Sequence, residues 1–415
     1  MKKVAVMVVL LMLSVGAFSQ MTIKGRVITA ASGAPVPGSS VFISNTSKGT
    51  TADKDGYFEL TDIPAGKHEL IISSIGYETN VFSFSSEQLP LQLRVELEVK
   101  VSELQNVTVE PFTEEGWDKW GRTFLDNFIG NTANAARCTI KNEKAIRFRY
   151  YKKSSRLVAF SDEPVVIENK ALGYRIHFRL EDFEVNFKEH SSLFTGYPLF
   201  EEIGKSRKGL QNKWKRNRDK AYYGSMMHFM RSVYNNKIAE EGFEVRRMVQ
   251  IPNTEKERVK KIYKPGRVVS ENNSTNRIVT GREKDSVKTA RDSADYYQRV
   301  LRQDDFIEEY GRDLLTADSL IASKDGNYKI MYFTDYLYVT FKKELEEEGY
   351  IAFFHENRRP TFQRSVITLI AQDPFEIDVN GSYYPAQELS ARAYWGWSEK
   401  IADYLPLDYE PGDDQ

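Results

Sequence analysis

The chain has 415 residues, of which 41% are hydrophobic and 13% aromatic, and its formal net charge at pH 7 is -1. This length allows two or three domains with separate cores, and the composition excludes an extended disordered chain. The small net charge excludes a general attraction to nucleic acid or to anionic membranes, so a charged partner would have to meet a local patch.

Residues 1–20 have the layout of a secretory signal peptide, with two lysines, an apolar run and the small-residue pattern Ala17-Phe18-Ser19. We therefore expect an exported protein, located in the periplasm, in association with the outer membrane, or outside the cell. No later segment offers ~18 consecutive apolar residues, so no helical membrane span is expected after signal cleavage. Cys138 is the only cysteine, which excludes an intramolecular disulfide and a lipid anchor at the cleavage point.

Residues 21–110 consist of short apolar runs separated by turn signals. Asp55-Gly56 is typical of a hairpin tip, and Pro64 and Gly66 suit two positions of a type I turn. About seven short strands over ~90 residues predict an antiparallel β-sandwich. The aspartates near the hairpin tip approach the spacing of a calcium loop, but its glutamate and flanking helices are missing. We expect these aspartates to bond the backbone of the turn instead.

The stretch from Ile23 to Thr79 resembles the carboxypeptidase regulatory-like domain, an immunoglobulin-like or prealbumin-like β-sandwich with a carbohydrate-binding-like fold. The resemblance is carried by Gly25, Val27, Gly33, Pro35, Val36, Gly38, Val41, Thr51, Asp53, Gly56, Phe58, Pro64, Gly66, Gly76 and Tyr77. It implies a non-catalytic module. The sequence LRVELEVKVSELQNVTVEP that follows is similar to the exit of this module in TonB-dependent receptors, but the remaining chain does not read as a transport barrel of ~22 strands.

Residues 111–116 are expected to form a linker, and residues 117–415 an α+β domain of unknown function. Aromatic residues recur at helical spacing from Trp117 to Phe128 and predict an amphipathic helix. Alternating apolar residues then predict strands between positions 145 and 187. The predicted fold class is therefore mainly β with α+β, in which an N-terminal immunoglobulin/prealbumin-like β-sandwich is followed by an α+β domain.

Further along, two helices are predicted to meet near Tyr223-Gly224, with Ser225 as the N-cap of the second helix. A polar insertion is expected near 252–295, where large apolar residues are scarce. Strands are expected to resume at positions 328–344, 350–356 and 365–371. The order of these segments also resembles a group of Bacteroidetes envelope proteins described only by their carboxypeptidase-like regulatory domain, which implies no particular chemistry for the second region.

A zinc carboxypeptidase needs a histidine and a glutamate with two residues between them, and none of the five histidines meets that spacing. We therefore predict no metal, no cofactor and no catalytic residue. One alternative is a serine hydrolase built on Ser225 and His228, although the GxSxG elbow is absent. Another is a glycosidase built on an acidic pair such as Glu181/Asp182, although such pairs arise by chance among 59 acidic residues.

Two clusters of side chains could contact a ligand. The binding residues that we predict are Lys213, Trp214, Arg216, Arg218, Trp395 and Trp397. The first four belong to a basic cluster, which suits an anionic glycan, a lipid head group or an acidic partner; the alternative is a solvated helix face with its tryptophan packed on the core. The last two could form a platform for sugar rings, or could anchor a terminal helix.

These features together predict an exported, non-catalytic protein of the cell envelope. We expect it to bind or scaffold a glycan or an envelope protein through its β-sandwich, with no nucleic-acid partner because of the secretory signal. The first alternative is a hydrolase in the second region, in which Ser225, His228 or an acidic pair would line a concave pocket with shifted pKa values. The second alternative is a component that forms a small outer-membrane barrel.

Overall fold

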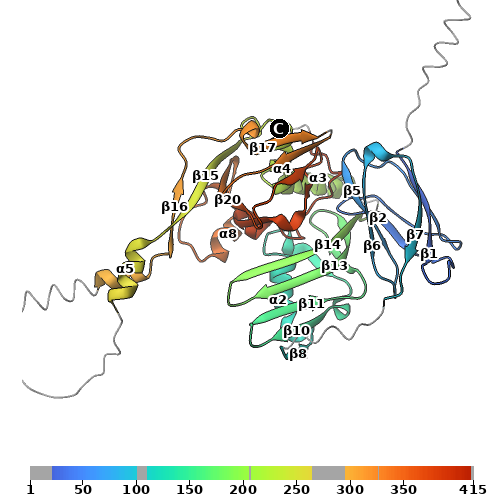
Figure 1. Ribbon diagram of the computed structural model, residues 1–415, viewed down its shortest axis with the longest axis horizontal. Coiled ribbons are helices and arrows are strands. Elements are labelled where there is room, and N and C mark those ends of the chain that lie inside the picture. The colour runs from blue at the N-terminus through green and yellow to red at the C-terminus, as the bar shows by residue number, and fades with distance from the viewer. Residues whose placement is uncertain (1–20, 101–109, 205–206, 264–294, 326, 413–415) are drawn as a thin grey trace, which may run out of the picture.

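The computed structural model describes residues 21–100, 110–204, 207–263, 295–325 and 327–412 (Figure 1). The expected signal peptide and most of the expected polar insertion lie outside the described residues. The described chain forms three bodies: a β-sandwich (blue in Figure 1), a seven-stranded sheet (teal to green), and a third body with two further sheets (yellow to red). The predicted fold class, mainly β with α+β, is confirmed.

The β-sandwich packs two sheets against each other. The three-stranded sheet has the order β4 (Tyr57–Leu60), β1 (Ile23–Thr29) and β7 (Leu91–Leu97). The four-stranded sheet has the order β3 (Gly49–Thr51), β2 (Ser40–Ile43), β5 (Lys67–Ser73) and β6 (Asn80–Ser85). Buried residues alternate with exposed ones along β1 and β4 and meet those of the other sheet in one core. β1 pairs with β7 in parallel, and the other pairs of the sandwich are antiparallel.

The turn expected at Asp55-Gly56 is present, and Gly56 adopts a φ of 81°, which favours glycine. Asp53 Oδ1 accepts hydrogen bonds from the backbone N of Asp55 (2.9 Å) and of Tyr57 (2.8 Å). The expected bonding of an aspartate to the turn is thus confirmed. The prediction of a hairpin is wrong, because the strands on either side of the turn do not pair with each other. β3 pairs with β2 and β4 pairs with β1, so the turn crosses from one sheet to the other.

The second body is a seven-stranded sheet with one long helix on its face. Its main path runs through β8 (Phe112–Glu115), β10 (Arg147–Tyr151), β11 (Arg156–Phe160), β13 (Tyr174–Asn186), β12 (Val165–Asn169) and β9 (Cys138–Ile140), and β14 (Ser191–Glu202) pairs with β13. The predicted amphipathic helix is confirmed as α2 (Trp117–Phe128). Phe124 and Phe128 of α2 pack against Phe183 and Phe178 of β13, with ring centroids 4.7 and 5.0 Å apart. The segment expected as a linker, residues 111–116, contains β8.

The third body contains a five-stranded and a four-stranded sheet. The first has the order β16 (Phe306–Tyr310), β15 (Phe243–Pro252), β19 (Tyr336–Leu345), β20 (Phe362–Leu369) and β23 (Leu389–Ala393). The second has the order β17 (Ile321–Asp325), β18 (Tyr328–Met331), β21 (Phe375–Ile377) and β22 (Tyr383–Tyr384). Further α-helices are α3 (Lys208–Tyr222), α4 (Met226–Tyr234), α5 (Thr254–Ile262), α7 (Ala317–Leu320), α8 (Glu348–Phe353) and α9 (Tyr394–Ser398), and residues 295–301 are also helical. Short 3-10 helices occur at η1 (Ser86–Gln88), η2 (Ala135–Arg137), η3 (Glu143–Ala145) and η4 (Ala386–Glu388).

One local prediction in this region differs from the structure, and another is confirmed. Positions 350–356 were expected as a strand, but their first residues belong to α8, which buries Tyr350 and Ile351 and exposes Phe353. A short apolar run does not distinguish a strand from a helix by itself, and here the helical period prevails. The two predicted helices around positions 208–234 are confirmed as α3 and α4, and Ser225 Oγ caps α4 by accepting a hydrogen bond from the backbone N of His228.

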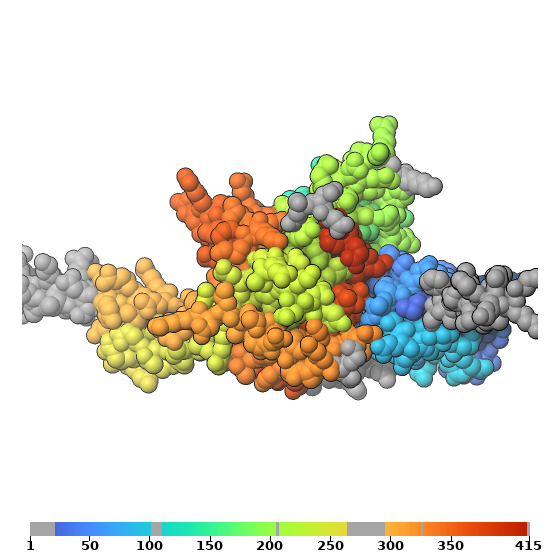
Figure 2. Space-filling view, turned by 90° about the horizontal axis from the view of Figure 1, so that it is seen from above, coloured from blue at the N-terminus to red at the C-terminus, as the bar shows by residue number. Residues whose placement is uncertain are grey.

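The segment after α9 joins all three bodies. Ile401 and Ala402 are buried in the core of the seven-stranded sheet. The backbone N of Leu407 then donates to the backbone O of Asn45 in the sandwich (2.7 Å), and Asp408 accepts from the backbone N of Ser47 (2.9 Å). The sandwich therefore lies directly against the rest of the chain, as Figure 2 shows for the blue surface beside the orange and red segments. Within the described chain, no helix is both long and apolar enough to cross a membrane.

Candidate functional site

A cavity of about 760 Å³ opens between α3, the turn before α4, the β19–β20 connection and the segment around α9. The loop before β9 and the end of β12 close its other side. This volume lies within the range of ~300–1,000 Å³ that is usual for sites of small organic ligands. The cavity therefore unites side chains of the second and third bodies that are far apart in the sequence.

Two carboxyl groups from the segment after α9 line this cavity. Glu399 Oε1 accepts a hydrogen bond from the backbone N of Met226, at the start of α4 (2.8 Å). Asp403 accepts hydrogen bonds from Thr132 Oγ1 (2.6 Å) and Asn134 Nδ2 (2.7 Å). Each carboxyl group is therefore held in place by groups from another part of the chain.

The surroundings of these two groups change their acidity. Burial raises the pKa of Glu399 from its ordinary 4.5 to about 7, and the carboxylate of Asp403 adds to this effect. Burial likewise raises the pKa of Asp403 from 3.8 to about 7, against the opposing hydrogen bonds from Thr132 and Asn134. Carboxylic acids with a pKa near 7 can donate as well as accept a proton at neutral pH. Sequence reasoning missed both residues; the available signal was two carboxylates four residues apart in an aromatic segment.

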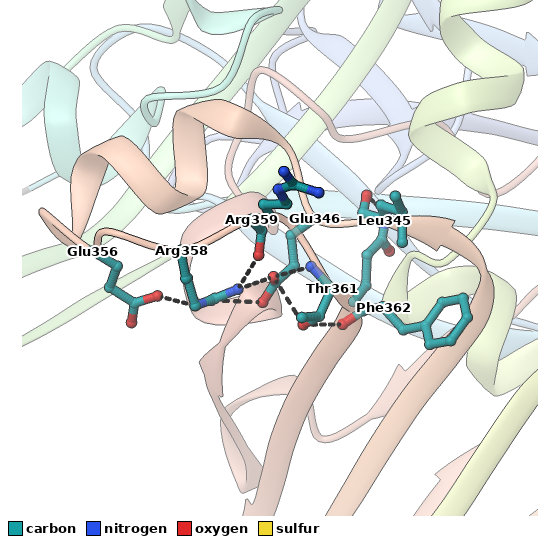
Figure 3. Close-up of polar contacts among 8 residues, drawn as sticks. Leu345, Glu346, Glu356, Arg358, Arg359, Thr361 and Phe362 are labelled. Carbon is teal, nitrogen blue, oxygen red and sulfur yellow. Dashed lines mark hydrogen bonds and ion pairs between the residues drawn. The ribbon is translucent and has the colours of Figure 1, made fainter.

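Strand β19, strand β20 and the connection between them bring further polar groups to the cavity, namely Glu344, Gln363 and Glu347. This connection is fixed by Glu346, which accepts hydrogen bonds from Arg358 Nη2 (3.0 Å) and the backbone N of Thr361 (2.9 Å) (Figure 3). Burial alone would raise the pKa of Glu346, but the hydrogen bonds from Arg358 and Thr361 together outweigh it and lower the pKa. These hydrogen bonds therefore hold Glu346 in its ionised form, and Glu346 in turn fixes the backbone beside Glu344 and Glu347.

The Ser225–His228 alternative does not form a catalytic pair in this structure. Ser225 Oγ accepts a hydrogen bond from the backbone N of His228 (3.1 Å) and acts as a helix cap. His228 Nδ1 accepts from the backbone N of Gly224 (3.1 Å), and Nε2 lies 3.2 Å from Glu241 Oε2. Burial lowers the pKa of His228 to about 4. Although Ser225 lines the cavity, neither ring nitrogen of His228 is placed to activate its hydroxyl group.

The structure brings three of the six predicted binding residues to the cavity, namely Lys213, Trp214 and Trp397. The other three do not line it, and these are Arg216, Arg218 and Trp395. Arg216 is exposed on α3. Arg218 is engaged structurally, because its Nε donates to the backbone O of Leu172 (2.7 Å) and its guanidinium stacks 3.9 Å from the ring centre of Tyr174.

The tryptophans are buried rather than displayed. Trp214 Nε1 donates to the backbone O of Lys170 (3.1 Å), so this residue packs on the core as the alternative interpretation expected. Trp395 Nε1 donates to the backbone O of Gly224 (2.7 Å). Trp395 and Trp397 are 2% and 4% exposed, so they form no open platform on the surface and instead anchor α9. Trp397 nevertheless forms part of the cavity wall.

Among the described residues, no group of three or more histidine, cysteine, aspartate or glutamate side chains is arranged to hold a metal ion. The acidic pair Glu181/Asp182 does not line the cavity. The chemistry that the site offers is therefore hydrogen bonding, aromatic contact and proton donation by the two carboxyl groups.

Comparison with known proteins identifies the N-terminal body. Residues 23–109 match the family model described as the CarboxypepD_reg-like domain. A search of curated proteins gave no match. Among solved structures, the chain is similar to a mutant type II Cohesin-X-Dockerin complex from Acetivibrio cellulolyticus, with 26% identity over 19% of this chain and 57% of that chain (TM-score 0.17). A second mutant of that complex has 26% identity over 18% and 51% (TM-score 0.15), so the chain spans little more than half of these two structures.

A third similar structure is a putative membrane-associated protein of unknown function from Bacteroides fragilis. It is 10% identical over 86% of this chain and 92% of that chain, with a TM-score of 0.16. The family match therefore identifies the sandwich alone.

Proposed function

We propose that this chain is an exported cell-envelope protein that binds a glycan, because residues 23–109 match the family model of the carboxypeptidase regulatory-like domain, a β-sandwich of a kind found in envelope proteins. The sandwich is a non-catalytic support, and the ligand enters the cavity of about 760 Å³ between the second and third bodies. This cavity is the single observation that carries the proposal.

The composition of the cavity wall suits an uncharged polar ligand. Four basic and five acidic side chains line it, so the wall has little net charge. Aromatic side chains, including Trp214 and Tyr394, offer apolar contact, and the amides of Asn134, Asn217 and Gln363 offer hydrogen bonds. A sugar ring presents one apolar face and a rim of hydroxyl groups, which require these two kinds of contact.

A second candidate function is hydrolysis of the bound glycan. Glycosidases use two carboxyl groups, one of which remains protonated at the working pH. Glu399 and Asp403 both line the cavity, and burial raises the pKa of each to about 7. An acidic pair that lines a concave pocket is the feature expected of the hydrolase alternative, so turnover has to be measured together with binding.

The test uses purified residues 21–415 and a polysaccharide fraction from the cell envelope, with binding measured by isothermal titration and hydrolysis by the release of reducing ends. Ala133 is exposed at the cavity, so Ala133→Trp narrows the cavity without removing a core side chain. Ala31→Trp, at an exposed site on the sandwich, is the matched control. We expect Ala133→Trp to weaken binding at least about tenfold, equivalent to ~1.4 kcal/mol, and Ala31→Trp to leave binding unchanged.

Three other outcomes would contradict the proposal in different ways. Equal binding by Ala133→Trp and the unaltered chain would place the glycan outside the cavity. A stoichiometric protein that is captured with the chain, with no glycan, would make this a scaffold for an envelope protein. Release of reducing ends that is lost in Glu399→Gln would establish the hydrolase instead of the non-catalytic binder.

A further inference from the structure

A second, smaller cavity, the outer hollow, has a volume of about 320 Å³ and lies on the five-stranded sheet of the third body. Tyr350 of α8 closes one side of it. Among the described residues, the outer hollow and the large cavity have no lining residue in common, so the two are separate. The floor spans three adjacent strands and includes Tyr338 of β19, Arg364 and Val366 of β20, and Arg392 of β23.

The strand register places the two floor arginines beside each other. The residues that flank Tyr338 in β19 are buried in the hydrophobic core, so the side chain of Tyr338 faces the other way. Val366 pairs with Tyr338 on one side and with Arg392 on the other. Arg364 lies two residues before Val366 on the same face, so it is a diagonal neighbour of both, at a spacing of ~7–8 Å. Two arginine side chains at this spacing can converge on one anion.

The positive charge of Arg364 is not offset by the rest of the described chain. Arg358, the third arginine of the outer hollow, is held between Glu346 and a second glutamate (Figure 3), so it is not available to a ligand. Arg392 Nη2 lies 3.5 Å from Glu308 Oε1. Within the described residues, Arg364 makes no hydrogen bond and no ion pair. It therefore offers one free positive charge at the floor.

Both floor arginines are open to solvent, and one of them lies near an aromatic ring. Arg364 is exposed, and the side chain of Arg392 is 44% exposed. Burial raises the pKa of Tyr338, and the charge of Arg364 opposes this rise, so the guanidinium group lies near the phenol. A ligand can therefore reach two guanidinium groups and the ring without displacing a core side chain.

We propose that the outer hollow binds a sugar that carries one carboxylate group, such as a uronic acid unit. Arg364 and Arg392 hold the carboxylate, because a guanidinium group matches a carboxylate with two parallel N–H···O bonds. The sugar ring packs on Tyr338, since a flat aromatic face suits the apolar face of a pyranose. This site is independent of the uncharged ligand proposed for the large cavity.

Three features of the outer hollow favour this ligand over others. One free positive charge matches a monoanion, whereas a phosphate monoester carries roughly two negative charges at pH 7. β19 and β20 are inner strands whose backbone groups are already paired, so a peptide cannot bind this part of the floor by strand addition. The volume of about 320 Å³ lies at the lower end of the range for small organic ligands, which suits a short saccharide.

The test titrates glucuronic acid into residues 21–415 and follows binding by isothermal titration and by the NMR signals of the sugar. Arg364→Gln removes the free charge and should weaken binding at least about tenfold. Arg364→Lys keeps the charge but loses the planar fork, and its affinity should fall between the two. The matched control is Arg359→Gln, because Arg359 is exposed, does not line the outer hollow and points away from Glu346 in Figure 3. This control should change binding less than about twofold.

Three further probes separate the parts of the ligand. Glucose lacks the carboxylate, glucose 1-phosphate replaces it by a phosphate, and N-acetylglutamate lacks the sugar ring. The quantity to compare is the binding that Arg364→Gln removes, because sugar held in the large cavity does not contribute to it. We expect glucuronic acid to exceed all three probes in affinity, and added salt to weaken it. The unfolding temperature should stay the same in every variant, because Arg364 and Arg359 are exposed.

The outcomes that would overturn this inference are distinct from those of the proposed function. Equal affinity of Arg364→Gln and the unaltered chain for glucuronic acid would refute the site. An equal loss in Arg359→Gln would mean that general positive charge, and not the outer hollow, attracts the sugar. If glucose 1-phosphate or N-acetylglutamate bound as tightly as glucuronic acid, the choice of a carboxylate or of a sugar ring, respectively, would be refuted. The large cavity keeps its own test with Ala133→Trp, so either proposal can fail alone.

Discussion

Replacing Glu399 by glutamine should stabilise the fold at alkaline pH. The pKa of Glu399 is about 7 in the folded chain against 4.5 for an ordinary glutamate, so the folded state holds a proton that the unfolded chain releases. Stability therefore falls as the pH rises from about 4.5 to 7, and at pH 8 the ionised side chain costs the fold at most about 3 kcal/mol. Glutamine carries no charge, and its Oε1 can still accept the hydrogen bond from Met226.

The assay is urea unfolding of residues 21–415 at pH 4.5 and pH 8, followed by tryptophan fluorescence. All five tryptophans lie between positions 117 and 397, so the signal reports the second and third bodies rather than the sandwich. Glu399→Gln should exceed the unaltered chain by about 2–3 kcal/mol at pH 8 and match it closely at pH 4.5. Asp403 keeps its own pH dependence, so the quantity to compare is the difference between the two proteins at each pH.

The control is Glu240→Gln, at an exposed site, which should change stability by less than about 0.5 kcal/mol at either pH. The reasoning is refuted if Glu399→Gln is less stable than the unaltered chain at pH 8. It is also refuted if the difference between them does not depend on pH, because the carboxyl group would then not be the source of the cost.

Two further predictions concern contacts described above. Gly173 has a φ of 75°, and a Cβ there would lie 2.3 Å from Trp214 Cδ2, so Gly173→Ala should cost about 3 kcal/mol by thermal unfolding. Gly38→Ala, at a φ of 73° with open space around it, should cost only about 1 kcal/mol, and equal losses would show that Trp214 does not matter. Asp408→Ala removes the acceptor of the Ser47 amide and should speed its hydrogen exchange roughly fivefold, whereas Glu410→Ala, at an exposed neighbouring carboxylate, should not. Unchanged exchange at Ser47 would mean that this contact does not hold the sandwich.

The sandwich could be predicted from sequence because its signals are local. Turn residues such as Asp55-Gly56 and the alternation of apolar residues mark each strand by itself, and the family motif is spread evenly over the module. The pairing of the strands could not be predicted in the same way. The turn after β3 leads into the other sheet, because β4 pairs with β1, and β1 pairs in parallel with the distant β7. No local pattern encodes that choice.

The cavity could be predicted only in part, because it is assembled from distant pieces of chain. Lys213 and Trp214 were found as a basic cluster with an aromatic residue, but the same pattern also included Arg218, whose hydrogen bonds are consumed inside the protein. Glu399 and Asp403 were missed because their segment is rich in aromatic residues, which drew the interpretation to Trp395 and Trp397. Their significance depends on burial against α4 and the loop before β9, which is a property of the folded chain alone.

The contact between the sandwich and the segment after α9 can form only late in the synthesis of the chain. The last strand of the sandwich ends at Leu97, whereas Leu407 and Asp408, which bond Asn45 and Ser47, are made much later. At the usual rate of synthesis, ~5–20 residues per second, the sandwich waits roughly 15–60 s for these partners. Pro198 and Phe200, which bond the backbone N of Asn45 and the backbone O of Thr46, are made well before that. Only the backbone O of Asn45 and the backbone N of Ser47 therefore wait for the C-terminal segment, and the docking of this segment is the last step that completes the loop.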